Sequence, residues 1–335
     1  MSHAPRHLGR LAGLLAVLLV LTGAGLAVLR PADAALRPSD ADRGALRGLV
    51  EEVTAARGHR YGAVDGTGRR MDAAKIVQAA DGRYLAVYHS RLGDGRFHAA
   101  VATSQDLLHW HRRHDFGPGS SQPTLAQGPD GGFVLAWEQD PYNHFAVRHY
   151  PGAAALLAGR ADRSHDAPRT LSSCSEGTPA ISEIRGPRAA VVELTGHYRA
   201  DCGTDRELRA TLSGFTTWQT RPDRRLDTAL LAHGTGGNIG DRDLLHYRGS
   251  ALLLIEGQRR EGDFGSWGTY VYDPAAGGAD RARIRTHAGS TAFANPSATL
   301  LTAPDGRPSL LVSVFIPREG AAPGETGQLL YYVTL

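Results

Sequence analysis

The sequence is poor in several residue types, and each shortage excludes a class of protein. Lys75 is the only lysine, so arginine carries nearly all of the positive charge. The formal net charge is only +3, and the arginines are scattered among aspartates and glutamates. A surface that follows nucleic-acid phosphates needs clustered positive charge. We therefore expect no nucleic-acid partner.

Cysteine is also scarce, and the chemical motifs that depend on local spacing are missing. The chain has two cysteines, Cys174 and Cys202. No cysteine-based zinc pattern, phosphate-binding loop or nucleophile elbow occurs. We expect no cofactor and no metal site, although a structural cation in a central channel remains an open alternative. An even pair of cysteines in an exported chain predicts a single disulfide.

The one long apolar run lies at the start of the chain. Arg6 and Arg10 precede an apolar stretch over residues 11–29, and small residues follow at 32–34. This order is typical of a secretory signal. A retained anchor is the alternative, because the run approaches the roughly 20 residues that span a bilayer. Either reading predicts a secreted or extracytoplasmic protein, with membrane contact only if the segment is retained.

We expect three parts in the chain: a signal or anchor over residues 1–35, a helix and linker over 36–60, and a main domain over 61–335. The helix is indicated by Leu46, Leu49, Val50 and Val53, which recur at helical spacing. Beyond them the helical period disappears.

The main domain is built from five copies of one phrase, which start near Met71, Ser121, Glu176, Ile239 and Ala294. Each copy has a small polar opening, a short apolar strand, a glycine-centred turn and a second, stronger strand. Most copies add a third strand. Repeats of this length, with about four strands each, describe blades around an axis. The fold class is therefore all-β, a five-bladed β-propeller. The last copy ends at its third strand, so we expect residues 61–64 to supply its outer strand.

The repeat openings are the candidate site. In a propeller the first strand of each blade is innermost, so these openings converge on the central axis. Convergent carboxylate, amide and guanidinium groups indicate a ligand site. The residues at the openings are Asp72, Gln122, Glu176, Asn238, Asp241, Arg242, Asp243 and Asn295. Structural alternatives stay open: Asp72 could cap a turn, Glu176 could be a loop acid, and residues 241–243 could brace neighbouring blades.

Several of these motifs resemble five-bladed glycoside hydrolases of family 43 and their relatives, which include arabinanases, arabinofuranosidases and xylosidases. The resemblance runs from about residue 70 to the end. It rests on Asp72-Ala73 before a DGRYLAVY hairpin, on the Ser-x-Asp-Leu-x-x-Trp phrase of Ser104 to Trp110, and on Ser175-Glu176-Gly177. It implies a carbohydrate partner.

The resemblance also implies a two-carboxylate hydrolysis, in which one carboxyl group protonates the leaving group and another activates water. Asp72 would be the catalytic base and Glu176 the catalytic acid. The family has a third carboxylate at the opening of blade two, where this chain has the neutral Gln122. Binding of a sugar without turnover is therefore the alternative, with Tyr142 or Trp267 stacking on the sugar. A protein-interaction propeller is the third reading.

Overall fold

The computed structural model describes residues 38–335. The expected signal or anchor therefore lies outside the described residues. Within residues 38–335, no helix combines the length and the apolar character needed to cross a bilayer.

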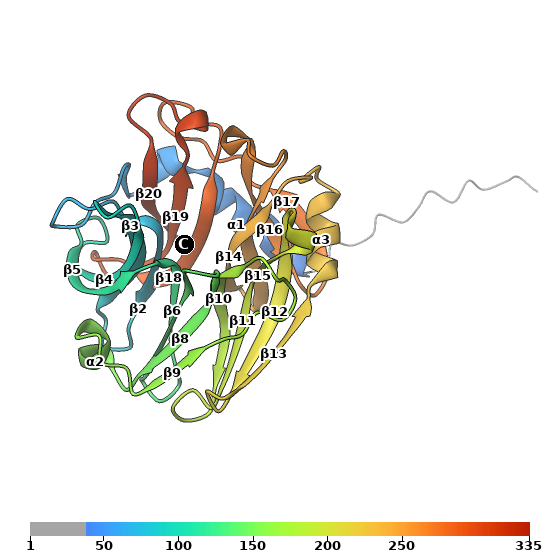
Figure 1. Ribbon diagram of the computed structural model, residues 1–335. Helices are drawn as coiled ribbons and strands as arrows, with labels where there is room; N and C mark the ends of the chain where they lie inside the picture. The colour runs from blue at the N-terminus through green and yellow to red at the C-terminus, as the bar shows by residue number, and fades with distance from the viewer. Residues whose placement is uncertain (1–37) are drawn as a thin grey trace, which may run out of the picture. The chain divides into compact units, whose positions relative to one another are not determined.

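The described chain is a five-bladed propeller of four-stranded antiparallel sheets (Figure 1). Blade 1 comprises β2 (Asp72–Gln78), β3 (Tyr84–Arg91), β4 (Phe97–Ser104) and β5 (His111–Pro118). Blade 2 comprises β6 (Ser120–Gln127), β7 (Phe133–Gln139), β8 (His144–Tyr150) and β9 (Arg163–Asp166). Blade 3 comprises β10 (Glu176–Arg185), β11 (Val191–Arg199), β12 (Asp205–Ser213) and β13 (Thr217–Pro222). Blade 4 comprises β14 (Ile239–Tyr247), β15 (Ser250–Gln258), β16 (Trp267–Asp273) and β17 (Gly278–Arg281).

Blade 5 closes the ring with a strand from the other end of the domain. It comprises β18 (Ala294–Thr302), β19 (Pro308–Ile316), β20 (Gly327–Thr334) and β1 (Gly58–Arg60). β1 pairs antiparallel with β20, and Gly58 lies opposite Tyr332. The closing strand thus comes from the segment before the blades, as expected, but it ends just before the expected residues 61–64. Closure satisfies the outer edge of β20.

The first strands of the five blades contact one another in a ring around the axis. Helices are few and lie outside this ring: α1 (Pro38–Glu51), α2 (Ala153–Leu157) and α3 (Arg224–Leu231), with 3₁₀ turns η1 (Val53–Ala55), η2 (Ala200–Cys202), η3 (Phe264–Ser266) and η4 (Arg318–Gly320). The Asp223 side chain caps α3 by accepting the Leu226 backbone N–H at 3.3 Å.

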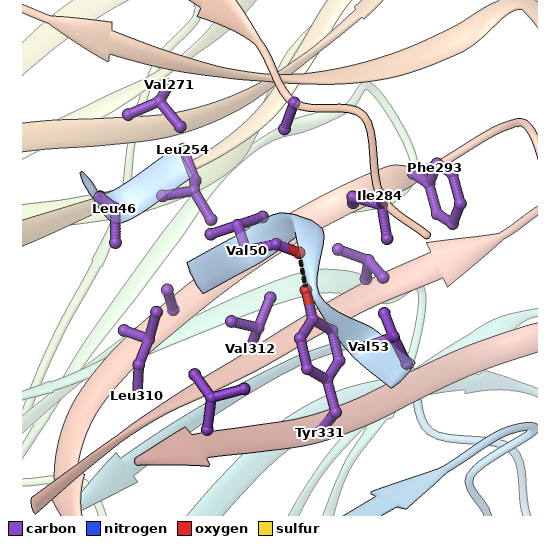
Figure 2. Packing of buried hydrophobic residues seen from close by; sticks show 14 of the residues in the cluster. Leu46, Val50, Val53, Leu254, Val271, Ile284, Phe293, Leu310, Val312 and Tyr331 are labelled. Atoms are coloured by element: carbon purple, nitrogen blue, oxygen red, sulfur yellow. Dashed lines mark hydrogen bonds between the residues drawn. The ribbon is translucent and has the colours of Figure 1, made fainter. Parts of the chain in front are cut away.

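Four of the five blade interfaces are sealed by apolar clusters that take residues from both blades, namely blades 1–2, 2–3, 4–5 and 5–1. Trp110 is 1% exposed and lies in the 5–1 cluster, as expected for a tryptophan between sheets. In the 4–5 cluster, α1 packs on blade 4 and adds Leu46 and Val50, and the Tyr331 hydroxyl of blade 5 donates to the Val50 carbonyl (Figure 2). Among the described residues, blades 3 and 4 share no such cluster.

The expected disulfide is present. Cys174 lies just before β10 and Cys202 lies in η2, just after β11. Their Cα atoms are 5.5 Å apart, within the range that a disulfide requires. The bond therefore ties the entry of the first strand of blade 3 to the exit of the second.

Candidate functional site

Every inner strand begins with a β-bulge at the same place. The register shifts between Asp72 and Lys75 in blade 1, and at the equivalent positions of the other four blades. In four blades a non-glycine residue of the bulge has a positive φ: Ala73 (52°), Gln122 (49°), Thr178 (49°) and Asn295 (45°). Such backbone is uncommon for residues with a side chain and clusters at functional sites. A proline follows the bulge residue in blades 2, 3 and 5, where its missing N–H is tolerated.

The bulges bind side chains from the preceding blade. His89 of β3 accepts the Gln122 N–H on Nδ1 at 2.8 Å, and Glu138 of β7 accepts the Thr178 N–H at 3.0 Å. Glu256 of β15 accepts the N–H of Asn295 in the same way. These three acceptors latch blade 1 to 2, blade 2 to 3, and blade 4 to 5.

Sequence reasoning missed the latch residues, although a signal was present. Each stands near the end of a second strand that is otherwise apolar, directly after Tyr88, Trp137 or Ile255. A buried acceptor at the end of an apolar strand needs a donor. Its partner is a backbone group of the next blade, which no single-strand pattern reveals.

Four of the predicted site residues meet at the axis. Lys75 Nζ donates to Asp241 Oδ1 and to the Arg242 carbonyl, both at 2.8 Å. Arg242 is fully buried and pairs with Glu207 of blade 3. Asn295 Nδ2 donates to Gln122 Oε1 at 3.1 Å. Gln122, Asp241, Arg242 and Asn295 therefore converge as expected, and the contacts of Asp241 and Arg242 are those of a brace between blades.

The carboxyl groups around this brace have perturbed pKa values. Burial raises the pKa of Glu256 to about 7, with the neighbouring Asp241 charge adding to the effect. Burial also raises the pKa of Asp243 to about 6, and Asp243 accepts the Ala298 N–H at 3.2 Å. The pKa of Glu207 is raised by burial despite its Arg242 partner. These acids hold protons closer to neutrality than ordinary carboxyl groups do.

The two residues expected to be catalytic are held by local contacts. Glu176 is 1% exposed, and its Oε1 accepts backbone N–H groups of residues 170, 171 and 172. The Asp72 carboxylate lies 3.3 Å from Arg70 Nε, and burial raises the Asp72 pKa against the opposing effect of Arg70. Asn238 Oδ1 accepts the Asp205 N–H at 3.0 Å and links blade 4 to blade 3.

A cavity of about 370 Å³ opens where the inner ends of blades 1, 2 and 3 meet. We call it the axial cavity. All but one of its lining residues are of polar types, and neither Asp72 nor Glu176 is among them. It is lined by His89, Phe97, Ser121, Gln122, Glu138, Asp140, Asn143, Ser175, Thr178, His197, Arg199 and Asp205. Of the predicted site residues, Gln122 alone contributes to this lining.

The axial cavity offers donors, acceptors and one apolar surface. Burial lowers the pKa of His89 to about 4, so the ring is neutral at physiological pH. Because His89 Nδ1 accepts the Gln122 N–H, its proton is on Nε2. The His89 ring also packs against Phe97, with 4.6 Å between ring centroids. Tyr142, 72% exposed, lies in the chain between the lining residues Asp140 and Asn143.

Within residues 38–335, no group of three histidine, cysteine, aspartate or glutamate side chains is arranged to hold an ion. Histidines 109, 111 and 114 are close in the sequence. Of these, His109 pairs with Asp106, with 2.6 Å between Nδ1 and Oδ2.

No protein-family model matches the sequence, and no curated protein matches it. Solved structures do match the fold. An exo-1,5-α-L-arabinanase from a bovine ruminal metagenomic library is 12% identical, with a TM-score of 0.52 over 82% of this chain and 94% of that chain. The RS223 β-xylosidase is 10% identical, with a TM-score of 0.51 over 83% and 95%. The GH43_1 enzyme from Xanthomonas citri complexed with xylose is 10% identical, with a TM-score of 0.51 over 86% and 92%.

At these identities the likeness is one of fold. It extends over most of both chains, and it agrees with the five sheets and their ring of inner strands. The chain therefore resembles the five-bladed family 43 glycoside hydrolases in architecture, as the sequence motifs predicted.

Proposed function

We propose that this protein is a glycan-active propeller that binds a carbohydrate in the axial cavity. The observation that carries the proposal is the cavity itself. Its volume of about 370 Å³ suits a small ligand, and its walls combine amide, imidazole, guanidinium, hydroxyl and carboxylate groups. A sugar presents hydroxyl groups that both donate and accept hydrogen bonds, which such a wall matches. The arabinanase and β-xylosidase of similar fold support the same ligand class.

In this proposal the sugar is recognised by hydrogen-bond donors, by acceptors and by an aromatic surface. Gln122 and Arg199 offer side-chain donors, while Glu138 and Asp205 accept from sugar hydroxyls. The exposed ring of Tyr142 gives the apolar face of a sugar a surface for stacking. Gln122, whose backbone is left-handed, lines the cavity, and its Oε1 accepts from Asn295 Nδ2.

Binding without turnover is the better supported form of this function. A general acid must be protonated near its working pH. The four carboxyl groups whose pKa values are raised most are not part of the axial cavity lining; they are Glu207, Asp227, Asp243 and Glu256. Three backbone donors bind Oε1 of Glu176, and its buried Oε2 has no hydrogen-bond partner among the described residues.

Glycoside hydrolysis is the second candidate, and one observation favours it. Glu138 of blade 2, whose carboxylate also accepts from Asn143 and Thr178, and Asp205 of blade 3 line the same cavity from different blades. An inverting hydrolase needs two carboxyl groups, about 6.5–9.5 Å apart, on opposite sides of the sugar. The pair Asp72 and Glu176, implied by the family resemblance, is the alternative assignment for the same reaction.

Calorimetric titration with arabino- and xylo-oligosaccharides, followed by analysis of released sugars, separates these functions. We expect saturable binding of at least one oligosaccharide, with affinity lowered about tenfold or more in His197→Ala and Arg199→Gln. The exposed Arg224→Gln on α3 is the matched control and should bind like the native protein. Absence of binding to any carbohydrate in a wide glycan panel would refute the proposal.

Turnover is tested on the same ligand. If sugars are released, Glu138→Gln and Asp205→Asn should each lower the rate about 100-fold or more while binding persists. Loss of release in Glu176→Gln and Asp72→Asn instead would assign the reaction to that pair. Binding by the native protein with no release after prolonged incubation identifies a carbohydrate-binding propeller.

We also propose that the protein is exported. The support is the charged and apolar order of residues 1–34 in the sequence, together with a disulfide in the described part of the chain. Fractionation of the producing cells and the mass of the mature chain test this. A full-length chain recovered from the cytoplasm with free thiols would contradict it.

A further inference from the structure

A second cavity in the described chain is separate from the axial cavity. It is a cleft of about 690 Å³ between the faces of blades 3 and 4, and it shares no lining residue with the axial cavity. We call it the blade 3–4 cleft. It lies at the one blade interface that lacks a shared apolar cluster among the described residues.

The two walls of the cleft differ in chemistry. Blade 3 contributes a mostly polar wall that includes Thr195, Thr211 and Gln219. Blade 4 contributes a mostly apolar wall that includes Leu244 and Leu253, and Leu226 of α3 extends it. A polar sheet face cannot pack dry against an apolar one, because its hydrogen-bonding groups would lose water without gaining partners. The mismatch keeps the interface open.

Tyr272 gives the cleft an unused donor. Its side chain lines the cleft from β16 and is 1% exposed, yet its hydroxyl has no hydrogen-bond partner among the described residues. Buried tyrosine hydroxyls normally find a partner. A ligand atom that accepts a hydrogen bond would satisfy this group.

Among the arginines around the cleft, only Arg221 has no ion-pair partner in the described part of the chain. Arg185 bridges Glu183 and Glu193, and Arg209 pairs with Asp223 at 2.6 Å. Arg221 is exposed at the cleft and forms no ion pair with any described residue. The lining has three acidic and three arginine side chains, so its formal charges balance, and Arg221 is the one of these six without an ion-pair partner among the described residues.

We propose that the blade 3–4 cleft is a second ligand site, which takes a small amphipathic organic anion. The anionic group of the ligand pairs with Arg221, its apolar body lies against Leu244 and Leu253, and an acceptor atom receives the Tyr272 hydroxyl. The cleft volume of about 690 Å³ falls within the usual range for small-molecule sites. This site is independent of the carbohydrate site and does not require that proposal to hold.

Fluorescence titration with anilinonaphthalene sulfonate, an apolar anion, tests the site directly. We expect saturable enhancement by the native folded protein. Tyr272→Phe should raise the dissociation constant about threefold to tenfold, the range expected for one lost hydrogen bond. Arg221→Gln should also raise the dissociation constant about threefold to tenfold, and it should reduce the salt dependence of binding.

Matched controls separate this site from unspecific binding. Tyr270→Phe removes the hydroxyl of another buried tyrosine of β16 that does not line the cleft, and Arg224→Gln removes an exposed arginine nearby on α3. Both should bind the probe like the native protein, as should His197→Ala in the axial cavity. Because the Tyr272 hydroxyl is unpartnered, Tyr272→Phe should unfold at the native temperature or above it. Native-like affinity in both Tyr272→Phe and Arg221→Gln, or no saturable enhancement by the native protein, would overturn the proposal.

Discussion

Blade 4 has two neighbours, and its two interfaces are built differently. Toward blade 5, apolar side chains of both sheets meet and α1 adds Leu46 and Val50, so the gap is filled (Figure 2). Toward blade 3, an apolar wall faces a polar one and a cleft of about 690 Å³ remains. The backbone architecture is the same at both interfaces. Side-chain chemistry on one face of each sheet therefore decides whether an interface serves stability or leaves space for a ligand.

The open interface still needs an attachment, and the axis supplies it. Arg242 of blade 4 pairs with Glu207 of blade 3, and it also donates to the Thr178 carbonyl. Both charged side chains are fully buried. Blades 3 and 4 are thus held at their inner ends by polar contacts, whereas blades 4 and 5 are held along their faces by apolar contacts.

The largest effect should come from breaking this inner attachment. Arg242→Met leaves Glu207 buried without its cation, so we expect a loss of about 3–5 kcal/mol in the free energy of unfolding. Urea denaturation measures the loss. The double variant with Glu207→Leu should recover part of the stability, because it removes the unpaired charge. If Arg242→Met unfolds at the native urea concentration, the brace does not hold blades 3 and 4 together.

The next effect contrasts the two interfaces directly. Leu310→Ala in the blade 4–5 cluster, where the side chain is fully buried, should cost about 2–5 kcal/mol. Leu244→Ala on the cleft wall should cost about 1 kcal/mol, because that partly exposed side chain already borders open space. Urea midpoints of the two variants give the comparison. Equal losses would mean that the cleft is closed in solution.

The pH dependence of stability tests the latch between blades 4 and 5. The folded pKa of Glu256 is about 7, above its ordinary value of 4.5. The folded state therefore keeps a proton that the unfolded state releases, and stability should fall by about 3 kcal/mol as pH rises from about 4.5 to about 7. Glu256→Gln should flatten this slope, whatever its effect on stability at one pH.

Two controls sharpen that measurement. The exposed Glu319→Gln should leave the slope unchanged. Below pH 4 the trend should reverse, because hydrogen bonds lower the pKa of Asp106 and Glu325 to about 2, and their stabilising contribution is lost as pH falls toward that value. A stability that rises steadily from pH 4.5 to 7 would contradict the raised Glu256 pKa.

The smallest effect belongs to the rim of the cleft. Arg209 is 43% exposed and pairs with Asp223 beside α3. Exposed ion pairs contribute little, so Arg209→Gln should cost less than about 1 kcal/mol in thermal or urea unfolding. A loss as large as that of Leu310→Ala would show that rim charges, rather than the axial brace, hold blades 3 and 4.

Much of the fold could be predicted because it is repeated locally. Five copies of a strand, turn and strand phrase predicted five sheets, and an unfinished last copy predicted closure by an N-terminal strand. The disulfide followed from an even pair of cysteines beside two consecutive strands. The convergence of Gln122, Asp241, Arg242 and Asn295 followed from the innermost place of the first strands.

Side-chain direction could not be predicted in the same way. Side chains alternate between the faces of a strand, and each bulge adds a residue that shifts this alternation. Glu176 and Gln122 both open a repeat, yet Glu176 binds backbone donors of residues 170–172 while Gln122 lines the axial cavity. A bulge begins each of the five inner strands, and three of these bulges are bound by an acceptor side chain of the preceding blade.

The sequence by itself determined the number of blades, their order and the polar character of the axis, because these depend on the period of apolar residues along the chain. It also determined the disulfide, because the chain has only one pair of cysteines. The tertiary structure alone decided which polar residues are latches, which line a cavity, and which interface stays open. His89 and Glu138 are latches because each accepts a backbone N–H of the next blade. The Tyr272 hydroxyl is available to a ligand because it has no hydrogen-bond partner among the described residues. Hydrogen bonding and packing between blades depend on distances in space, and a linear pattern carries no record of them.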